Sequence, residues 1–452
     1  MFRKYVVIVF MFLFLFPLTV FAGGGTSLEY SYSRKYTPED VKKVEKIKGE
    51  KPKDTEGTIQ VQLWPDAVRV ADGESVVFYD FKDDYVYRSS DTGKSYFRVP
   101  IYSVTDYLIS EGQNRMYLAQ VMGAAGVDLA EYNPGELEIL FGVPLQLTKT
   151  SITASEKDGV YHFVLDSKKE FASYSPSKYK LGGVKRDFLR FLSYEIKTHP
   201  DVKNHIAENG TLPESMDFIY HLNSNKVTEK YKLLSVKETD KSAAQQLKSM
   251  VITFKTGDAL GAITDRVFSG RPIDTEKEKI TAKKFIVRAL AGGNSFDALL
   301  CSINYGLLSG EKNGDLTKLV VPYIKEDSRS SVFINNLKYD SKEGALKATE
   351  ELASIDQKGL KYGHMIDIMQ ANAYVAAGEP DKALESFLTA LKKEPKVTGA
   401  WKDLGELYCG MYEYPQGWLC FEAAEYLKKD HQMLKSIEEK KAALKNAFGE
   451  FF

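Results

Sequence analysis

The residue types that carry out chemistry are present in this sequence, but none has the spacing of a known catalytic motif. There is no H-E-x-x-H, G-x-S-x-G, phosphate-binding loop, G-x-G-x-x-G or C-x-x-C. His199 and His205 are the closest histidine pair and have no neighbouring cysteine, which favours a solvent-facing pair over a metal site. Asp80, Asp83 and Asp84 lack the EF-hand order, and a hairpin turn accounts for them. The sequence therefore predicts no catalytic residue, no metal site and no cofactor.

One pattern of aromatic and small residues does have specific spacing. It occurs twice, with Trp401, Leu404, Gly405, Tyr408, Phe421 and Ala424 in the second copy and Tyr374, Ala383, Phe387, Ala390 and Pro395 in the first. Tyr374 and Tyr408 are 34 residues apart, as are Phe387 and Phe421. Each copy predicts two antiparallel helices that approach closely at small residues, with aromatic side chains between them. The stretch from His364 to Lys428 resembles the tetratricopeptide repeat (TPR) family in this spacing.

The resemblance implies a protein-binding groove lined by the first helix of each repeat. The matching positions in this chain are Ile368, Asn372, Val375, Lys402, Glu406 and Cys409. TPR domains that clamp a terminal carboxylate need lysine where this chain has Ile368, so the resemblance does not extend to that clamp. The alternative is that these six residues only pack or face solvent in a short solenoid.

Length and composition predict an ordinary globular protein of two or three domains. The chain has 452 residues, an apolar fraction of 43% and a net charge of −1, which gives no reason to expect a nucleic-acid surface. We expect an α+β fold class, in which an antiparallel β-sheet domain with flanking helices precedes an all-α, TPR-like solenoid. The expected boundaries are 1–22, a signal peptide; 23–57, a charged flexible arm; 58–250, the α+β domain; 251–355, a degenerate solenoid; and 356–452, the repeats with a capping helix.

The first 22 residues have the pattern of a secretory signal. Arg3 and Lys4 precede an unbroken apolar run from Val6 to Phe16, and a small-residue cleavage site ends at Ala22. An uncleaved membrane anchor is the alternative, because the apolar stretch approaches the ~20 residues that span a bilayer. No second stretch is long enough to span. We therefore expect an exported protein, periplasmic or extracellular, without a membrane span after cleavage.

Alternating residues and tight turns predict a β-meander from Thr58 to Ile101. Its aromatic residues stand on both faces, which also permits a concave apolar surface. The elements expected after it are helices at 104–122, 186–196 and 200–207 and strands at 137–143, 151–154, 160–165, 218–222 and 230–236.

Beyond residue 255 the strand signals give way to helices of 10 to 15 residues with glycine-rich joints. These predict about five helical pairs, closed by a capping helix from His431 to Phe448. Cys409 and Cys420 fall on the two helices of one repeat, but their offset along antiparallel helices is on the order of 10 Å, too far for a disulfide. Cys301 sits among apolar residues and is expected to be buried.

Three functions follow from these observations. The leading hypothesis is an exported, non-enzymatic protein that binds a protein partner in the cell envelope through the TPR-like groove. A second is a carrier that binds a lipid or other apolar ligand on the N-terminal sheet. A third is an uncharacterised hydrolase whose catalytic residues converge only in three dimensions, as a nucleophile beside a base.

Overall fold

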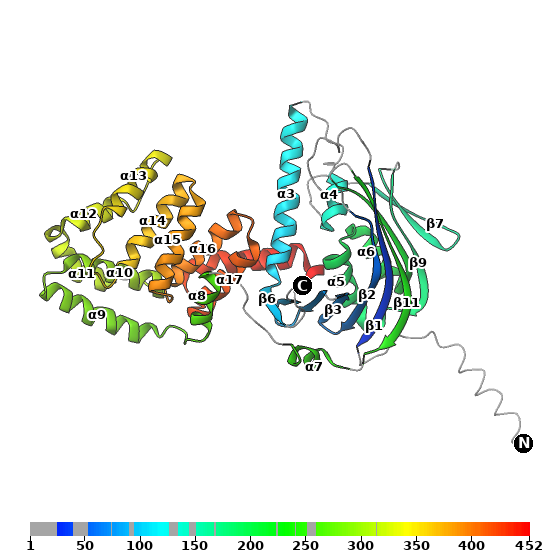
Figure 1. The fold of residues 1–452 in the computed structure, drawn as a ribbon, viewed down its shortest axis with the longest axis horizontal. Helices are drawn as coiled ribbons and strands as arrows, with labels where there is room; N and C mark the ends of the chain where they lie inside the picture. The colour runs from blue at the N-terminus through cyan, green and yellow to red at the C-terminus, as the bar shows by residue number, and fades with distance from the viewer. Residues whose placement is uncertain are drawn as a thin grey trace, which may run out of the picture. The chain divides into compact units, whose positions relative to one another are not determined.

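The computed structural model describes most of the chain, in two compact units. The described residues are 25–38, 53–73, 75–89, 95–125, 134–143, 151–166, 169–222, 225–239, 241–250, 259–312 and 314–452. Unit 1 consists of Met1–Thr253 together with Leu444–Phe452, and unit 2 is Phe254–Ala443. An antiparallel sheet followed by a run of helices confirms the predicted α+β class (Figure 1). The expected signal peptide lies outside the described residues.

The described strands of unit 1 form one eleven-stranded antiparallel sheet in the order β6-β5-β4-β3-β2-β1-β11-β10-β9-β8-β7. The strands are β1 Thr26–Pro38, β2 Thr55–Trp64, β3 Ala67–Asp72, β4 Ser75–Asp80, β5 Tyr85–Ser89, β6 Tyr96–Pro100, β7 Ile152–Lys157, β8 Val160–Leu165, β9 Lys169–Lys180, β10 Thr211–Leu222 and β11 Asn225–Glu238. Consecutive strands are neighbours except β6 and β7, which form the two edges of the sheet, and the one pair of non-consecutive neighbours is β1 with β11. The predicted meander is confirmed, and β1 joins it to the strands from the second half of the unit.

The strand β1 corrects the prediction of an exposed arm over residues 23–57. Tyr32 pairs with Gly57 of β2 on one side and with Tyr231 of β11 on the other. The side chains of Leu28 and Tyr30 are fully buried. Successive side chains of a strand point to opposite faces, so the apolar residues at 28, 30 and 32 are a two-residue period. The many charged residues of this region hid that period.

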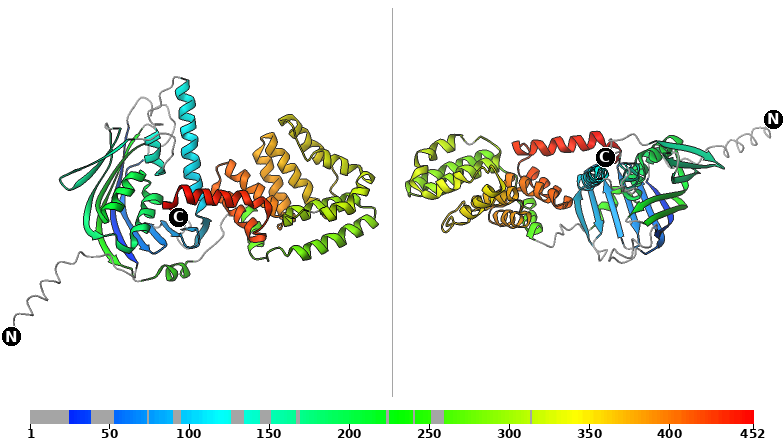
Figure 2. Two further views of the ribbon diagram at one scale, coloured as in Figure 1. Left: turned by 180° about the vertical axis from the view of Figure 1, so that it is seen from behind. Right: turned by 90° about the horizontal axis from the view of Figure 1, so that it is seen from above.

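Helices pack on one face of the sheet, which we call the inner face, and the sheet curves around them (Figures 1 and 2). They are α3 Tyr102–Ala124, α4 Pro134–Phe141, α5 Lys185–Phe191, the π-helical turn η3 Leu192–Ile196 and α6 Pro200–Asn209, with a short 3-10 turn η2 at Gly182–Val184. Residues 134–141 are helical, so the strand expected at 137–143 was wrong. A short apolar run does not distinguish strand from helix by its period, and Pro134 at the first helical position favours the helix.

The opposite, outer face is covered only in part. The helix α7 Ala243–Lys248 packs Leu247 against Trp64 and Phe78, which belong to the outer face of β2 and β4. The Trp64 indole also donates to the Lys241 carbonyl oxygen at 2.9 Å. This contact fixes the chain that follows β11 onto the sheet.

Unit 2 is helical in its described residues. Its elements are α8 Ala259–Phe268, α9 Thr275–Ala291, α10 Ser295–Ser309, α11 Gly314–Val320, η4 Val321–Glu326, α12 Ser328–Asn335, α13 Lys342–Ala353, α14 His364–Ala377, α15 Pro380–Lys393, α16 Thr398–Gly410, α17 Tyr414–Leu427 and η5 Gln432–Leu434. Pro322 lies where α11 has ended and the 3-10 helix η4 has begun, since proline cannot continue the α-helical hydrogen bonds. The two helical copies predicted from the 34-residue spacing correspond to α14 with α15 and α16 with α17.

The helix pair α16 and α17 crosses at two glycines. A Cβ at Gly405 would lie 2.4 Å from the Phe421 ring, and one at Gly417 would lie 2.5 Å from the Cys409 Sγ and 2.8 Å from the Gly405 carbonyl oxygen. Real Cβ atoms do not approach so closely. This explains why glycine occupies position 417, where the TPR pattern has alanine. Cys301, Cys409 and Cys420 all carry free thiols.

The helix expected to cap the solenoid ends in unit 1 and not in the solenoid. The helix α18 spans Lys435–Ala447, and residues from Leu444 onward belong to unit 1. Phe448, Phe451 and Phe452 have exposed fractions of 7%, 0% and 7%. The prediction that 356–452 is a single domain is therefore corrected. The apolar side chains at the end of the chain complete the core of unit 1.

Candidate functional site

The six residues predicted to line a groove lie on α14 and α16, at matching positions of the two helices. They do not share one environment. Ile368 is fully buried, Val375 is 45% exposed, and Asn372 and Cys409 are half-buried. The side chains of Lys402 and Glu406 are 15% and 50% exposed. Accessibility thus increases toward the C-terminal end of α14, whereas on α16 it is greatest at Glu406 and falls again at Cys409.

Three of the six residues are joined by a residue that the sequence did not single out, Asp403. The Lys402 ammonium lies 2.7 Å from Glu406 and 3.6 Å from Asp403. The Asn372 amide on α14 hydrogen-bonds to Asp403 on α16. Burial raises the pKa of Asp403 to about 6, although Lys402 and Asn372 act to lower it. We call Asn372, Lys402, Asp403 and Glu406 the polar strip.

The N-terminal ends of the two helices are covered by the end of α10. The Thr398 hydroxyl donates to the Leu308 carbonyl oxygen at 3.1 Å, and the His364 Nε2 lies 2.8 Å from the Asn304 Oδ1. Ile368 lies one turn beyond His364 and has no exposed surface. Ile368 was predicted to line an open groove, but its side chain is fully buried in this structure and is not accessible to a partner.

Cys409 was predicted to line the groove, but its side chain points elsewhere. Its sulfur faces the backbone of α17 at Gly417, so the thiol fills the helix crossing. Val375, on the corresponding turn of α14, presents its side chain to solvent. The part of the predicted site that a partner can reach thus consists of the polar strip and Val375.

Acidification from pH 7 to pH 5 is expected to act in opposite directions on two groups of unit 2. Burial lowers the pKa of His364 to about 4. As the pH falls, His364 takes up a proton in the unfolded chain before it does so in the folded chain. This lowers the free energy of unfolding by about 2 kcal/mol between pH 7 and pH 5. Because the pKa of Asp403 is raised, this carboxylate takes up a proton in the folded chain before it does so in the unfolded chain. This raises the free energy of unfolding by about 1 kcal/mol over the same range.

The measurement is urea unfolding at both pH values, followed by the fluorescence of Trp401 and Trp418. Between pH 7 and pH 5, the free energy of unfolding of the His364→Gln variant should rise by about 1 kcal/mol, because only Asp403 then responds. That of the Asp403→Asn variant should fall by about 2 kcal/mol, because only His364 then responds. If both variants changed with pH as the unmodified protein does, this assignment of the two groups would be wrong.

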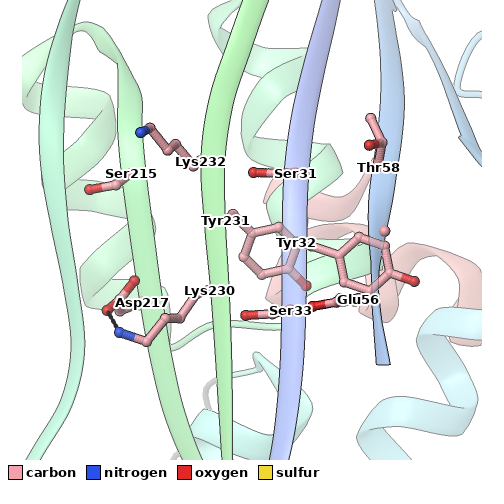
Figure 3. A pocket seen from close by; sticks show the side chains of 11 residues that line it. Ser31, Tyr32, Ser33, Glu56, Thr58, Ser215, Asp217, Lys230, Tyr231 and Lys232 are labelled. Atoms are coloured by element: carbon pink, nitrogen blue, oxygen red, sulfur yellow. Dashed lines mark hydrogen bonds and ion pairs between the residues drawn. The ribbon is translucent and has the colours of Figure 1, made fainter. Parts of the chain in front are cut away.

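Unit 1 carries a hydrophilic trough on the outer face of its sheet, with a volume of about 720 Å³. Its side chains come from β1, β2, β10 and β11 (Figure 3). Ser31 pairs in register with Lys232 and Thr58, and Ser33 pairs with Lys230 and Glu56, so all six belong to one face. Lys230 is neutralised by Asp217 at 2.8 Å. An antiparallel sheet commonly solvates one face in this way, and we assign the trough no ligand.

The inner face behind the trough holds a buried carboxylate. Glu229 accepts hydrogen bonds from Arg34 at 2.6 Å, from the Tyr220 hydroxyl at 2.5 Å and from the Tyr231 hydroxyl at 2.9 Å. Its side chain is 4% exposed. Burial acts to lower the pKa of Arg34, but the Glu229 carboxylate raises it overall. Burial, reinforced by Glu229, raises the pKa of both tyrosines. The network stabilises the junction of β1, β10 and β11.

A nucleophile does lie beside a base in unit 1, but the pair is sealed. The Lys203 ammonium donates to the Ser193 hydroxyl at 2.9 Å and to the Gly142 carbonyl oxygen at 3.0 Å. Burial lowers the pKa of Lys203 to about 8. Ser193 is 0% exposed and Lys203 is 3% exposed, and the Phe451 ring centroid lies 5.0 Å from the ammonium. A substrate has no access, so the contact is a buried structural one.

In the part of the chain that the structure describes, no three His, Cys, Asp or Glu side chains come together as metal ligands. No described helix is long and apolar enough to cross a membrane. His199 lies 3.2 Å from the Glu138 carboxylate, and the His205 ring hydrogen-bonds to the Tyr174 hydroxyl on the inner face. Both histidines are therefore internal contacts of unit 1, and the solvent-facing pair expected from the sequence is corrected.

Comparison with known proteins adds no assignment. No family model matches the chain, and no curated protein matches it.

Proposed function

We propose that this is an exported, non-enzymatic protein that binds a segment of a partner protein in the cell envelope, with α14 and α16 as the contact surface. The observation that carries the proposal is the polar strip. Lys402 and Asp403 of α16 interact with each other, and Asn372 of α14 hydrogen-bonds to Asp403, which leaves the Glu406 carboxylate half-exposed beside Lys402. A preorganised charged group of this kind contributes specificity because little side-chain freedom is lost on binding.

The chemistry of the strip favours a basic partner segment with an apolar side chain. Asp403 and Glu406 together outnumber Lys402, so the strip has an excess of negative charge above the pKa of Asp403. Val375 adds an exposed apolar side chain on the neighbouring helix. The resemblance of this region to TPR repeats supports the same reading. Neither the apolar-ligand carrier nor the hydrolase has a comparable feature among the described residues.

The charge of Glu406 is the basis of a direct test. A Glu406→Lys variant should lower affinity for the partner about tenfold, because a half-exposed charge contact of about 1.4 kcal/mol is replaced by repulsion. The measurement is recovery of partners from an envelope extract by the immobilised protein, followed by titration of each recovered partner. A partner that requires Glu406 supports the proposal.

The matched control is Glu439→Lys on α18. Glu439 also pairs with a lysine four residues away, Lys435 at 3.7 Å, and is 66% exposed. It should leave binding unchanged. If every recovered partner bound the two variants equally well, the strip would not be the contact surface and the proposal would fail.

A further inference from the structure

The segment Leu444–Phe452 occupies a site built entirely by other parts of unit 1. The Tyr194 hydroxyl donates to the Phe451 carbonyl oxygen at 3.1 Å, and the Arg186 guanidinium donates to the Phe452 carbonyl oxygen. The Lys203 ammonium lies 5.0 Å from the centroid of the Phe451 ring. We call Tyr102, Arg186, Tyr194 and Lys203 the cradle.

The cradle recognises both rings and backbone of the segment. The Tyr194 ring meets Phe451 edge-on at 5.2 Å between centroids, and the Tyr102 ring lies 5.1 Å from that of Phe452. Each aromatic pair adds about 0.5–1.5 kcal/mol beyond the burial of its surface. Outside the cradle, the Lys445 ammonium lies 2.9 Å from the Asp84 carboxylate. The site is thus specific for two successive aromatic residues and a lysine several residues before them.

All of unit 2 separates this segment from the rest of unit 1 in sequence. The contacts depend only on the segment's own atoms, so the same segment from another molecule makes them equally well. Exchange of an identical element between copies is a known route to assembly that requires no new interface.

We propose that the cradle is an acceptor site for this segment of a second copy of the chain, and that copies associate by exchanging Leu444–Phe452. The occupant is identified by the structure itself, since the segment fills the cradle with both rings buried. Within one molecule the segment competes at an effective concentration in the millimolar range. Exchange between molecules is therefore rare when dilute and increases in proportion to protein concentration.

The ion pair between Lys445 and Asp84 allows a test on the unmodified full chain. Protein labelled with ¹⁵N and unlabelled protein are mixed, unfolded and refolded together, and then treated with a zero-length carbodiimide that joins a lysine to a contacting carboxylate. Mass spectrometry of the peptide pair that contains Lys445 and Asp84 shows whether both halves carry the same isotope. A mixed pair comes from two molecules.

The expected result is that mixed pairs increase about 100-fold between about 1 µM and about 100 µM protein, where they reach several per cent. The control is the cross-link between Lys169 and Glu136, whose side chains are 2.8 Å apart within the continuous part of unit 1. That pair should carry one isotope at every concentration. If mixed Lys445–Asp84 pairs were no more frequent than mixed control pairs at the higher concentration, the segment would dock only within its own molecule and the proposal would be overturned.

Discussion

Replacement of Phe451 by alanine is expected to lower the free energy of unfolding of unit 1 by about 3–5 kcal/mol. The ring is fully buried between Tyr194 and Lys203, and nothing in a packed core can move far enough to fill its volume. The substitution also removes the cation–π contact between the Phe451 ring and the Lys203 ammonium. Burial already disfavours the charged form of Lys203, so losing this contact adds to the cost. Urea unfolding followed by the fluorescence of Trp64, the only tryptophan of unit 1, measures the change.

Asn446→Ala provides the matched control for Phe451→Ala. Asn446 lies in the same segment but is exposed, so its replacement should change stability by less than about 0.5 kcal/mol. A Phe451→Ala protein whose unit 1 unfolded at the same urea concentration as the control would show that the segment contributes no packing to unit 1.

The second large effect is expected at Glu229. Replacement by alanine leaves the Arg34 guanidinium and the hydroxyls of Tyr220 and Tyr231 without their shared acceptor. Breaking a buried ion pair in this way costs about 3–5 kcal/mol, and a value near the lower limit is expected because the Arg34 side chain is 41% exposed and can be hydrated. Glu229→Gln keeps one acceptor oxygen and should cost about half as much.

Glu238 lies on the same strand as Glu229 but is exposed. Glu238→Ala therefore serves as the reference for removing a glutamate from β11, and we expect a change within about 0.5 kcal/mol. Thermal unfolding of the three variants measures the effect. Equal melting temperatures for Glu229→Ala and Glu238→Ala would contradict a stabilising role for the network.

The helices of unit 2 could be predicted from the sequence because the residues that begin, pattern and end each helix are close together in the chain. Helices of 10 to 15 residues were predicted beyond residue 255, and α10 and α13 have 15 and 12 residues. Each has a cap, an apolar period and a terminating residue within about 15 positions. The turn between α14 and α15 has an equally local signal, because Gly378 caps the end of α14 and Pro380 is the first residue of α15.

The organisation of unit 1 depends on contacts between distant residues, which a single sequence does not reveal. Tyr32 contacts Tyr231 across the sheet, and Tyr194 contacts Phe451. The period of two at Leu28 and Tyr30 is the one local signal that could have identified β1. No comparable signal distinguishes Phe451, because an apolar end of a helix is equally consistent with capping a solenoid.

The candidate site was predictable in position but not in composition. The repeat spacing placed Asn372, Lys402 and Glu406 on matching turns, and the structure joins them through Asp403. Asp403 follows Lys402 directly and has no repeat signature of its own. The full burial of Ile368 depends on tertiary packing, which no pattern within the repeats encodes.

The placement of Leu444–Phe452 in unit 1 has a consequence for the order in which the protein folds during synthesis. Domains generally fold from the N-terminal end as the chain emerges. Here the first strand, β1, waits about 190 residues for its partner β11, and the cradle stays empty until residue 452 has been made. Unit 2 has all of its own residues by position 443 and can finish folding first. The unit that begins first is therefore completed after unit 2, because its sheet has all of its strands by residue 238 but its cradle stays open until Leu444–Phe452 emerges.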